Sequence, residues 1–154
     1  NNSWNQLGTG DRLVPKPQAL KEEAEKADDR QQRLPTSKFS NAHIYEVACG
    51  KNHSALLQVD AKEHDGTITS SKVWTSGLAA NGRLGTGKDS EEGSNLEEVR
   101  FPKPQGGAVL GDMRFVVQRI CCGSDHTLAL CHLASMNGAS VAAGGRIFAW
   151  GLGS

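Results

Sequence analysis

The sequence predicts an all-β protein built from two copies of one repeat, and three observations support this. The stretch 47–57 recurs as 120–130, with an offset of 73 residues at every position. After its histidine, each copy continues as a short apolar run that is typical of a strand covered on both faces. A content of 18 glycines with only 4 Phe, 3 Trp and 1 Tyr favours many turns over long helices. Self-similarity at a long fixed offset indicates a repeat architecture.

Two further motifs occur twice, and both lie in turn-like sequence. The run Leu-Gly-Thr-Gly at 7–10 recurs at 84–87, and the run Pro-Lys-Pro-Gln at 15–18 recurs at 102–105. The order of the motifs is the same in both copies, whereas the spacers between them differ in length. Repeats built from strands with variable surface loops behave in this way.

Two spacers are insertions whose role the sequence does not define. The first, 19–43, is rich in helix formers but has only a thin apolar face. We expect a short solvated helix or an irregular loop there, with a partner-binding helix as the alternative. The second, 88–98, carries five acids and one lysine, so we expect a solvated loop.

The strand that follows each histidine is predicted to pair with the next apolar segment. Strands over 54–59 and 127–131 are equivalent, and they precede the strand-like segments 71–77 and 145–151. Each pair can form an antiparallel hairpin. The connections 60–70 and 132–144 are longer than a tight turn requires, so we expect loops there. Helix is expected only in the spacers.

The residues best placed for chemistry are Cys49, His53, Cys122 and His126, which occupy the same positions in the two copies. They could in principle be four zinc ligands, but zinc sites usually show closer cysteine pairs. We expect both histidines to be buried and to form hydrogen bonds with groups of their own or the neighbouring repeat, because repetition is what a structural role predicts. No catalytic, cofactor-binding or metal-binding constellation is predicted.

Charge and hydropathy exclude several classes of partner. The 17 basic and 17 acidic residues give a net charge of zero, whereas nucleic-acid and membrane-surface binding require a basic excess. No apolar run approaches the ~20 residues of a membrane span. We therefore expect no membrane contact, no nucleic-acid binding by this segment, and an intracellular location in the nucleus or cytoplasm.

The motifs resemble the regulator of chromosome condensation repeats. Both copies of the histidine motif fit that family's signature in full, and Gly145–Gly151 fits its Gly-x-aliphatic-aromatic-x-Trp-Gly strand. The second turn motif departs from the family pattern at Arg83, where glutamine is usual, and Ser76 stands where tryptophan is usual. The residues that carry the structural motif are Cys49, Gly50, His53, Cys122, Gly123, His126, Trp150 and Gly151.

The resemblance implies a seven-bladed β-propeller with four antiparallel strands in each blade. Residues 1–154 would then hold about two of the seven blades, with long loop insertions and repeat boundaries near 1–77 and 78–151. Because two blades cannot close a ring, we expect a piece of a longer protein that meets the remaining blades, from the same or another chain. Without such neighbours, the apolar side chains of Leu56, Ile147 and Phe148 would lack full cover.

The resemblance also implies a function that works through protein contact. We expect a protein-interaction scaffold without enzymatic activity or a cofactor, and the positions between each glycine and histidine are candidates to face the partner: Lys51, Asn52, Ser124 and Asp125. The alternative is a guanine-nucleotide exchange factor for a Ran-like small GTPase, which is the activity of the family's founding member. An exchange factor also acts by contact, so neither function requires a catalytic side chain.

Overall fold

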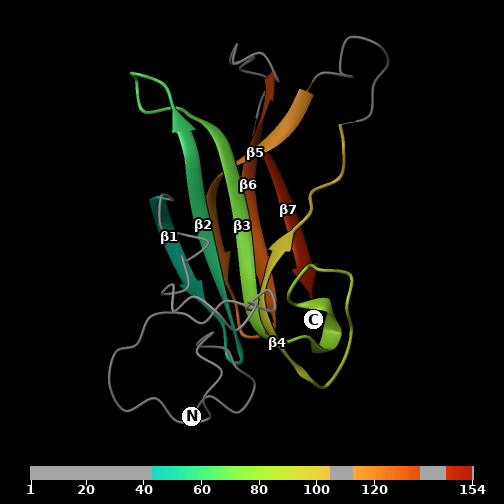
Figure 1. The fold of residues 1–154 in the computed structure, drawn as a ribbon. Coiled ribbons are helices and arrows are strands. Elements are labelled where there is room, and N and C mark those ends of the chain that lie inside the picture. The colour runs from blue at the N-terminus through green and yellow to red at the C-terminus, as the bar shows by residue number, and fades with distance from the viewer. Residues whose placement is uncertain (1–42, 105–112, 136–144, 154) are drawn as a thin grey trace, which may run out of the picture.

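The computed structural model describes residues 43–104, 113–135 and 145–153, which form two antiparallel sheets (Figure 1). The first sheet has the order β1 (His43–Cys49), β2 (His53–Lys62), β3 (Ile68–Leu78) and β4 (Gly93–Val99). The second has the order β5 (Met113–Cys122), β6 (His126–Ser135) and β7 (Arg146–Gly151). One short 3₁₀ turn, η1 (Ala80–Gly82), follows β3. The all-β prediction is therefore confirmed.

Part of the predicted organisation falls on residues that the structure does not describe. Residues 1–42 contain the first turn motif, the first proline motif and all but the last residue of the spacer 19–43. The predictions made for these segments lie outside the described residues.

The two sheets repeat the same hairpins in the same register. His53 pairs with Gly77 between β2 and β3, and His126 pairs with Gly151 between β6 and β7. Both histidine strands lie in the interior of their sheets, as predicted from the motif. The first sheet has four strands, while the described part of the second has three.

The loop predicted over 60–70 is shorter in the structure. β2 continues to Lys62 and β3 begins at Ile68, so the connection is only 63–67. It is closed by the Glu63 amide, which donates to the Thr67 carbonyl at 2.9 Å, and by Gly66 in the left-handed region. The sequence did not reveal this extension because the charged residues Asp60 and Lys62 interrupt the apolar run.

The solvated loop predicted over 88–98 is also wrong in its second half, which forms most of the edge strand β4. Leu96 and Val99 are buried there against the sheet. The acidic residues stay at the surface, where Glu97 accepts hydrogen bonds from Lys88, at 2.6 Å, and from Ser94. The density of charge concealed the two apolar positions that anchor the strand.

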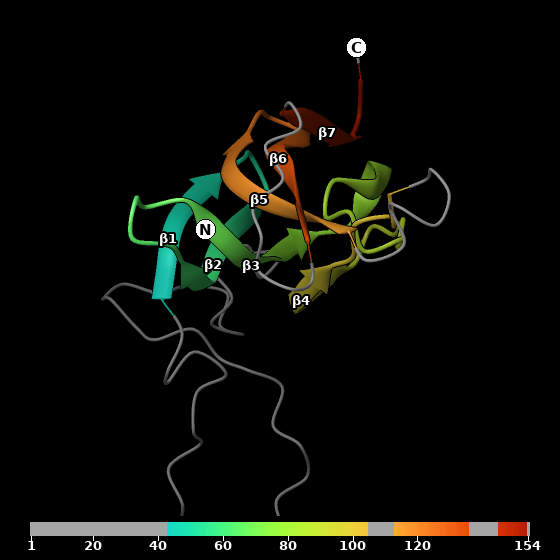
Figure 2. The ribbon, with the colours of Figure 1, turned by 90° about the horizontal axis from the view of Figure 1, so that it is seen from above.

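The core lies between the two sheets, which pack face to face (Figure 2). β5 crosses β1, β2 and β3, and it brings aliphatic side chains onto the first sheet. The buried cluster comprises Ala55, Leu57, Val59, Ile68, Val73, Val99, Val116, Val117, Ile120, Ala129, Cys131 and Ala134. Hydrogen bonds fix the register of the two sheets, since the Val117 amide donates to the Ser71 hydroxyl at 2.9 Å and the Ile120 amide donates to Glu46 at 2.8 Å.

The three apolar side chains expected to lack cover differ in their surroundings. Ile147 is 72% exposed, as predicted. Leu56 is only 7% exposed, so that expectation is wrong. Phe148 also has partners, because its ring makes edge contacts with the rings of Phe101 and Phe115, at centroid distances of 5.4 Å and 4.8 Å, respectively. β7 turns Phe148 toward the first sheet because successive side chains of a strand alternate between faces.

Among the described residues, no helix is both long and apolar enough to cross a membrane.

We expect truncation of Leu57 to alanine to destabilise the protein by about 2–5 kcal/mol, the usual cost of emptying a fully buried leucine site. The side chain has 0% exposure and lies in the cluster between the sheets. Leu152→Ala is the matched control, since that leucine is 50% exposed just after β7. Chemical denaturation measures both variants, and equal losses would contradict the assigned core.

Candidate functional site

The glycine and histidine of each repeat motif form one structural unit at a hairpin turn. The Gly50 amide donates to the His53 carbonyl at 2.9 Å, and the Gly123 amide donates to the His126 carbonyl at the same distance. A Cβ on Gly50 would lie 2.2 Å from Cε1 of His53, and a Cβ on Gly123 would lie 2.2 Å from Cε1 of His126. The imidazole therefore occupies the space that a side chain on the glycine would need. This explains the spacing Gly-x-x-His.

His53 joins the first sheet to the second. It is 1% exposed, and its Nε2 lies 2.9 Å from the Thr127 hydroxyl of β6. The same hydroxyl donates to the backbone carbonyl of Arg83 at 3.1 Å. Because a hydroxyl has a single proton, it accepts from His53, and the imidazole carries its proton on Nε2. Burial, followed by the nearby positive charge of Arg83, lowers the pKa of His53 and favours this neutral form.

Arg83 and Asp125 form a second link across the same junction. The guanidinium is only 4% exposed, and its Nη1 lies 2.6 Å from Oδ1 of Asp125 at the tip of the β5–β6 hairpin. Its Nε donates to the Ala80 carbonyl at 2.8 Å. The Ser124 hydroxyl and the Arg83 guanidinium together lower the pKa of Asp125. Arg83, which departs from the family pattern, therefore makes a structural contact with the next repeat.

The prediction that both motif histidines are buried holds for His53 and is wrong for His126. His126 has the same relation to its glycine, yet its side chain is exposed. The physical reason is the position in the stack: the second sheet covers His53, whereas no described element covers His126.

The Trp-Gly pair at the end of β7 makes two close contacts. Trp150 lies over the turn that follows β3, where a Cβ on Gly85 would be 2.7 Å from the indole nitrogen. Gly151 has a positive φ of 109°, and a Cβ there would lie 2.4 Å from the Asp125 carbonyl. Both glycines are needed for close approach, and the left-handed conformation of Gly151 adds a second reason.

The motif cysteines differ in their surroundings, since Cys49 is exposed, whereas Cys122 and the non-motif Cys131 are packed thiols. Cys122 is half-buried, and burial raises its pKa to about 11. Cys131 is buried in the core, with its pKa raised to about 12 for the same reason. Such thiols stay protonated at neutral pH, whereas thiolates bind metals. Within the described part of the chain, no three His, Cys, Asp or Glu side chains converge to hold a metal ion.

The four candidate partner-facing residues lie on two adjacent hairpin tips. The Lys51 amide donates to the Ser124 carbonyl at 3.0 Å, so the tips are held side by side. The Lys51 and Ser124 side chains are exposed, while Asn52 and Asp125 are half-buried. The Asn52 and Asp125 carbonyls accept from Leu78 and Leu152, respectively. Whether these tips contact a partner stays a prediction.

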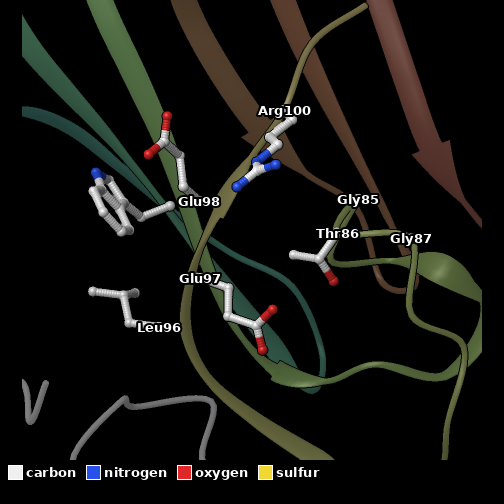
Figure 3. A pocket seen from close by; sticks show the side chains of 8 residues that line it. Gly85, Thr86, Gly87, Leu96, Glu97, Glu98 and Arg100 are labelled. Atoms are coloured by element: carbon white, nitrogen blue, oxygen red, sulfur yellow. The ribbon is translucent and has the colours of Figure 1, made fainter. Parts of the chain in front are cut away.

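A concave pocket of about 680 Å³ opens beside β4 (Figure 3). Its lining is Trp74, Gly85, Thr86, Gly87, Leu96, Glu97, Glu98 and Arg100. Trp74 is fixed by its indole N–H, which donates to Gln58 at 2.9 Å. The lining mixes both signs of charge with an apolar wall and contains no nucleophile paired with a base. A pocket with this lining can contact another molecule, but its lining residues do not form a catalytic arrangement.

Sequence reasoning identified the glycines and histidines of the junction but missed the residues that His53 and Asp125 contact. Thr127 and Arg83 lie far from those partners in the chain, at separations of 74 and 42 residues, respectively. The unusual arginine in a glutamine position was the only signal in the sequence, and it did not identify the partner.

Comparisons with known proteins find related sequences. The family model described as regulator of chromosome condensation (RCC1) repeat matches residues 70–130. A human protein named probable E3 ubiquitin-protein ligase HERC6 is 30% identical over 129 residues. The match covers 83% of this chain and 10% of that protein, so the chain spans about a tenth of the length of its relative.

We expect Gly50→Ala to destabilise the protein by about 1–3 kcal/mol, the cost typical of overpacking, because the new methyl group overlaps the His53 ring. Gly153→Ala is the control, since nothing lies within 4 Å of a Cβ built there and its φ is not in the left-handed region. Thermal unfolding compares the two variants. A harmless Gly50→Ala would show that the imidazole does not depend on the glycine.

His53 should make stability decline on acidification. Its pKa is lowered in the folded state, so the unfolded chain binds more protons once the pH falls below the ordinary value of 6.5. Stability is therefore complete above pH 6.5 and is lost as the pH falls further. We expect His53→Gln to reduce the dependence of the unfolding midpoint on pH below 6.5. His64→Gln, in the exposed β2–β3 turn, should retain the wild-type slope. The idea fails if both variants keep the same slope.

Proposed function

Because the chain belongs to the regulator of chromosome condensation repeat family and forms part of a propeller of that type, we propose that it is a protein-interaction scaffold. In this role the propeller presents a rigid surface of hairpin tips to another protein. The partner is a protein, and the activity requires neither a cofactor nor a reacting side chain.

The observation that carries this proposal is how the buried polar groups are used. His53, Arg83 and Thr127 all make contacts that hold one sheet against the next. A histidine committed to a structural hydrogen bond and kept neutral by burial is a poor acid or base for a substrate. The same contacts fix the two hairpin tips relative to each other, and a rigid surface loses little entropy when it binds.

The tips carry chemistry suited to a protein surface. Lys51 and Ser124 are exposed beside each other, and Asp125 lies between Ser124 and the buried Arg83. This places a cation, a hydroxyl and a partly exposed carboxylate within two neighbouring turns. A partner could read these groups by charge and hydrogen bonding.

The human relative is named a probable E3 ubiquitin-protein ligase. An enzyme that joins ubiquitin to proteins must bind proteins, and a scaffold of this kind could supply binding within a longer polypeptide. We therefore place this chain on the binding side of such a protein and assign no transfer chemistry to it.

The second candidate is guanine-nucleotide exchange on a Ran-like small GTPase. It is favoured by membership of the family whose founding member has that activity. The two functions share the need for a protein surface and differ in one measurable consequence: an exchange factor accelerates release of bound GDP, whereas a scaffold binds without doing so.

Reversal of charge at a hairpin tip should weaken partner binding. We expect Lys51→Glu to reduce retention of the partner proteins that the wild-type protein captures from cell extract. Lys103→Glu should leave retention unchanged, because it makes the same change at an exposed site outside the tips. Quantitative mass spectrometry measures retention, and a loss of about 1–3 kcal/mol in binding would correspond to roughly a 5- to 150-fold change in affinity.

A nucleotide-release assay separates the two candidates. With Ran loaded with fluorescent GDP, the wild-type protein should leave the rate of release at its spontaneous value. If the wild-type protein accelerates GDP release and Lys51→Glu abolishes that acceleration, the proposal of a scaffold is wrong and the protein is an exchange factor.

A further inference from the structure

The outer side of β4 is the open edge of the first sheet. β4 is the last strand in the order β1-β2-β3-β4, and no other strand pairs with its outer side within the described part of the chain. The opposite edge strand, β1, lies against β5, where the Ile120 amide donates to Glu46 at 2.8 Å. An open edge presents unpaired backbone amides and carbonyls, which can form hydrogen bonds with a further strand.

The pocket beside β4 follows this edge rather than one face of the sheet. Cross-strand pairing places Trp74 and Glu98 on one face and Thr75 and Glu97 on the other. The Thr75 hydroxyl donates, at 2.8 Å, to the carbonyl that precedes the turn 85–87, so this turn lies on the face of Glu97. The pocket is lined by residues of both faces. A strand added to the edge fits such a pocket, because its own side chains alternate between the two faces.

Two side chains of opposite charge line the pocket two residues apart (Figure 3). Glu98 and Arg100 are exposed, and among the described residues neither side chain has an ion-pair or hydrogen-bond partner. Alternate residues of an extended chain share a face, so both charges lie on the side of Trp74. The indole N–H donates to Gln58 at 2.9 Å, which holds the ring where its face can stack on a guanidinium.

We propose that β4 pairs with β4 of a second copy of this chain, antiparallel and across a twofold axis at Val99. All pairings within the two described sheets are antiparallel as well. In the dimer, Glu98 of each copy lies directly opposite Arg100 of the other. Each charge thereby gains a partner, and the guanidinium of one copy lies beside the Trp74 ring of the other.

The order of the charges selects both this occupant and this register. The sequence acid, any residue, base is complementary to itself when two copies run antiparallel, so a second copy supplies the required charges without further design. Moving the axis by one residue places two glutamates or two arginines directly opposite each other, and like charges at such positions destabilise a sheet. Pro102 has no amide to continue the ladder, so the contact is short and depends on the charges.

Sedimentation of the full-length protein, purified without partners, tests the proposal. We expect a reversible dimer whose affinity falls at least about tenfold in Glu98→Arg and in Arg100→Glu, because each change creates two pairs of like charges at the axis. Glu63→Arg and Lys51→Glu are the matched controls, since they reverse exposed charges away from this edge. A protein that stays monomeric up to about 1 mM would overturn the proposal. A dimer that survives both edge variants would do so as well.

A mixture of the two edge variants separates loss of the interface from loss of the fold. Glu98→Arg leaves two arginines at the edge and Arg100→Glu leaves two glutamates, so neither variant should pair with itself while the two should pair with each other. A double variant that carries both changes should also dimerise, because the order of charges is reversed in both copies. Fluorescence energy transfer between separately labelled chains measures both combinations. If neither combination restores association, β4 is not the interface.

The inference does not rest on the proposed scaffold, although a dimer would offer a partner two sets of hairpin tips. Lys51→Glu should abolish partner capture and leave the dimer intact. If no partner is captured while the two edge variants associate with each other, the scaffold is wrong and the dimer stands. Partner capture by a protein whose edge variants never associate rejects the dimer alone.

Discussion

The junction between the two sheets depends on an imidazole that fills the place of a missing side chain. Gly50 has no Cβ, so the ring of His53 can lie against its backbone and still reach the hydroxyl of the next sheet. Leaving the buried ring without its partner would cost about 1–3 kcal/mol. The turn, the orientation of the ring and the register between the sheets follow from this single arrangement. A larger residue at position 50 would disturb all three.

The remaining polar contacts of the junction reinforce that register. The buried guanidinium of Arg83 pairs with Asp125, and the backbone carbonyl of Arg83 accepts a hydrogen bond from the Thr127 hydroxyl. A buried ion pair contributes little net stability, because desolvation offsets the attraction, but removal of one partner leaves an uncompensated charge. The ion pair here fixes the geometry, because it holds Asp125, at the tip of the β5–β6 hairpin, against Arg83, in the turn that follows β3.

The predictions that failed did so where a property depends on neighbours in space. Residues 93–99 form a strand because Leu96 and Val99 meet the sheet, although the local charge density resembles that of a loop. His126 is exposed although its motif is intact, because burial of a motif histidine is a contribution of the adjacent sheet. Arg83 and Asp125 meet across 42 residues of sequence, and a spacing of that length carries no local pattern.

The all-β class, the repeated hairpins and the identity of the glycines and histidines at the turns could be predicted from the order of the amino acids. These features are local, since a glycine permits close approach and an apolar run after it prefers a strand, and repetition at a fixed offset confirms each assignment. Which polar groups meet, and which faces are covered, could be seen only in the folded protein. Those outcomes arise when two sheets stack, because the contact between Thr127 and His53 exists only after residues 74 positions apart are brought within 2.9 Å.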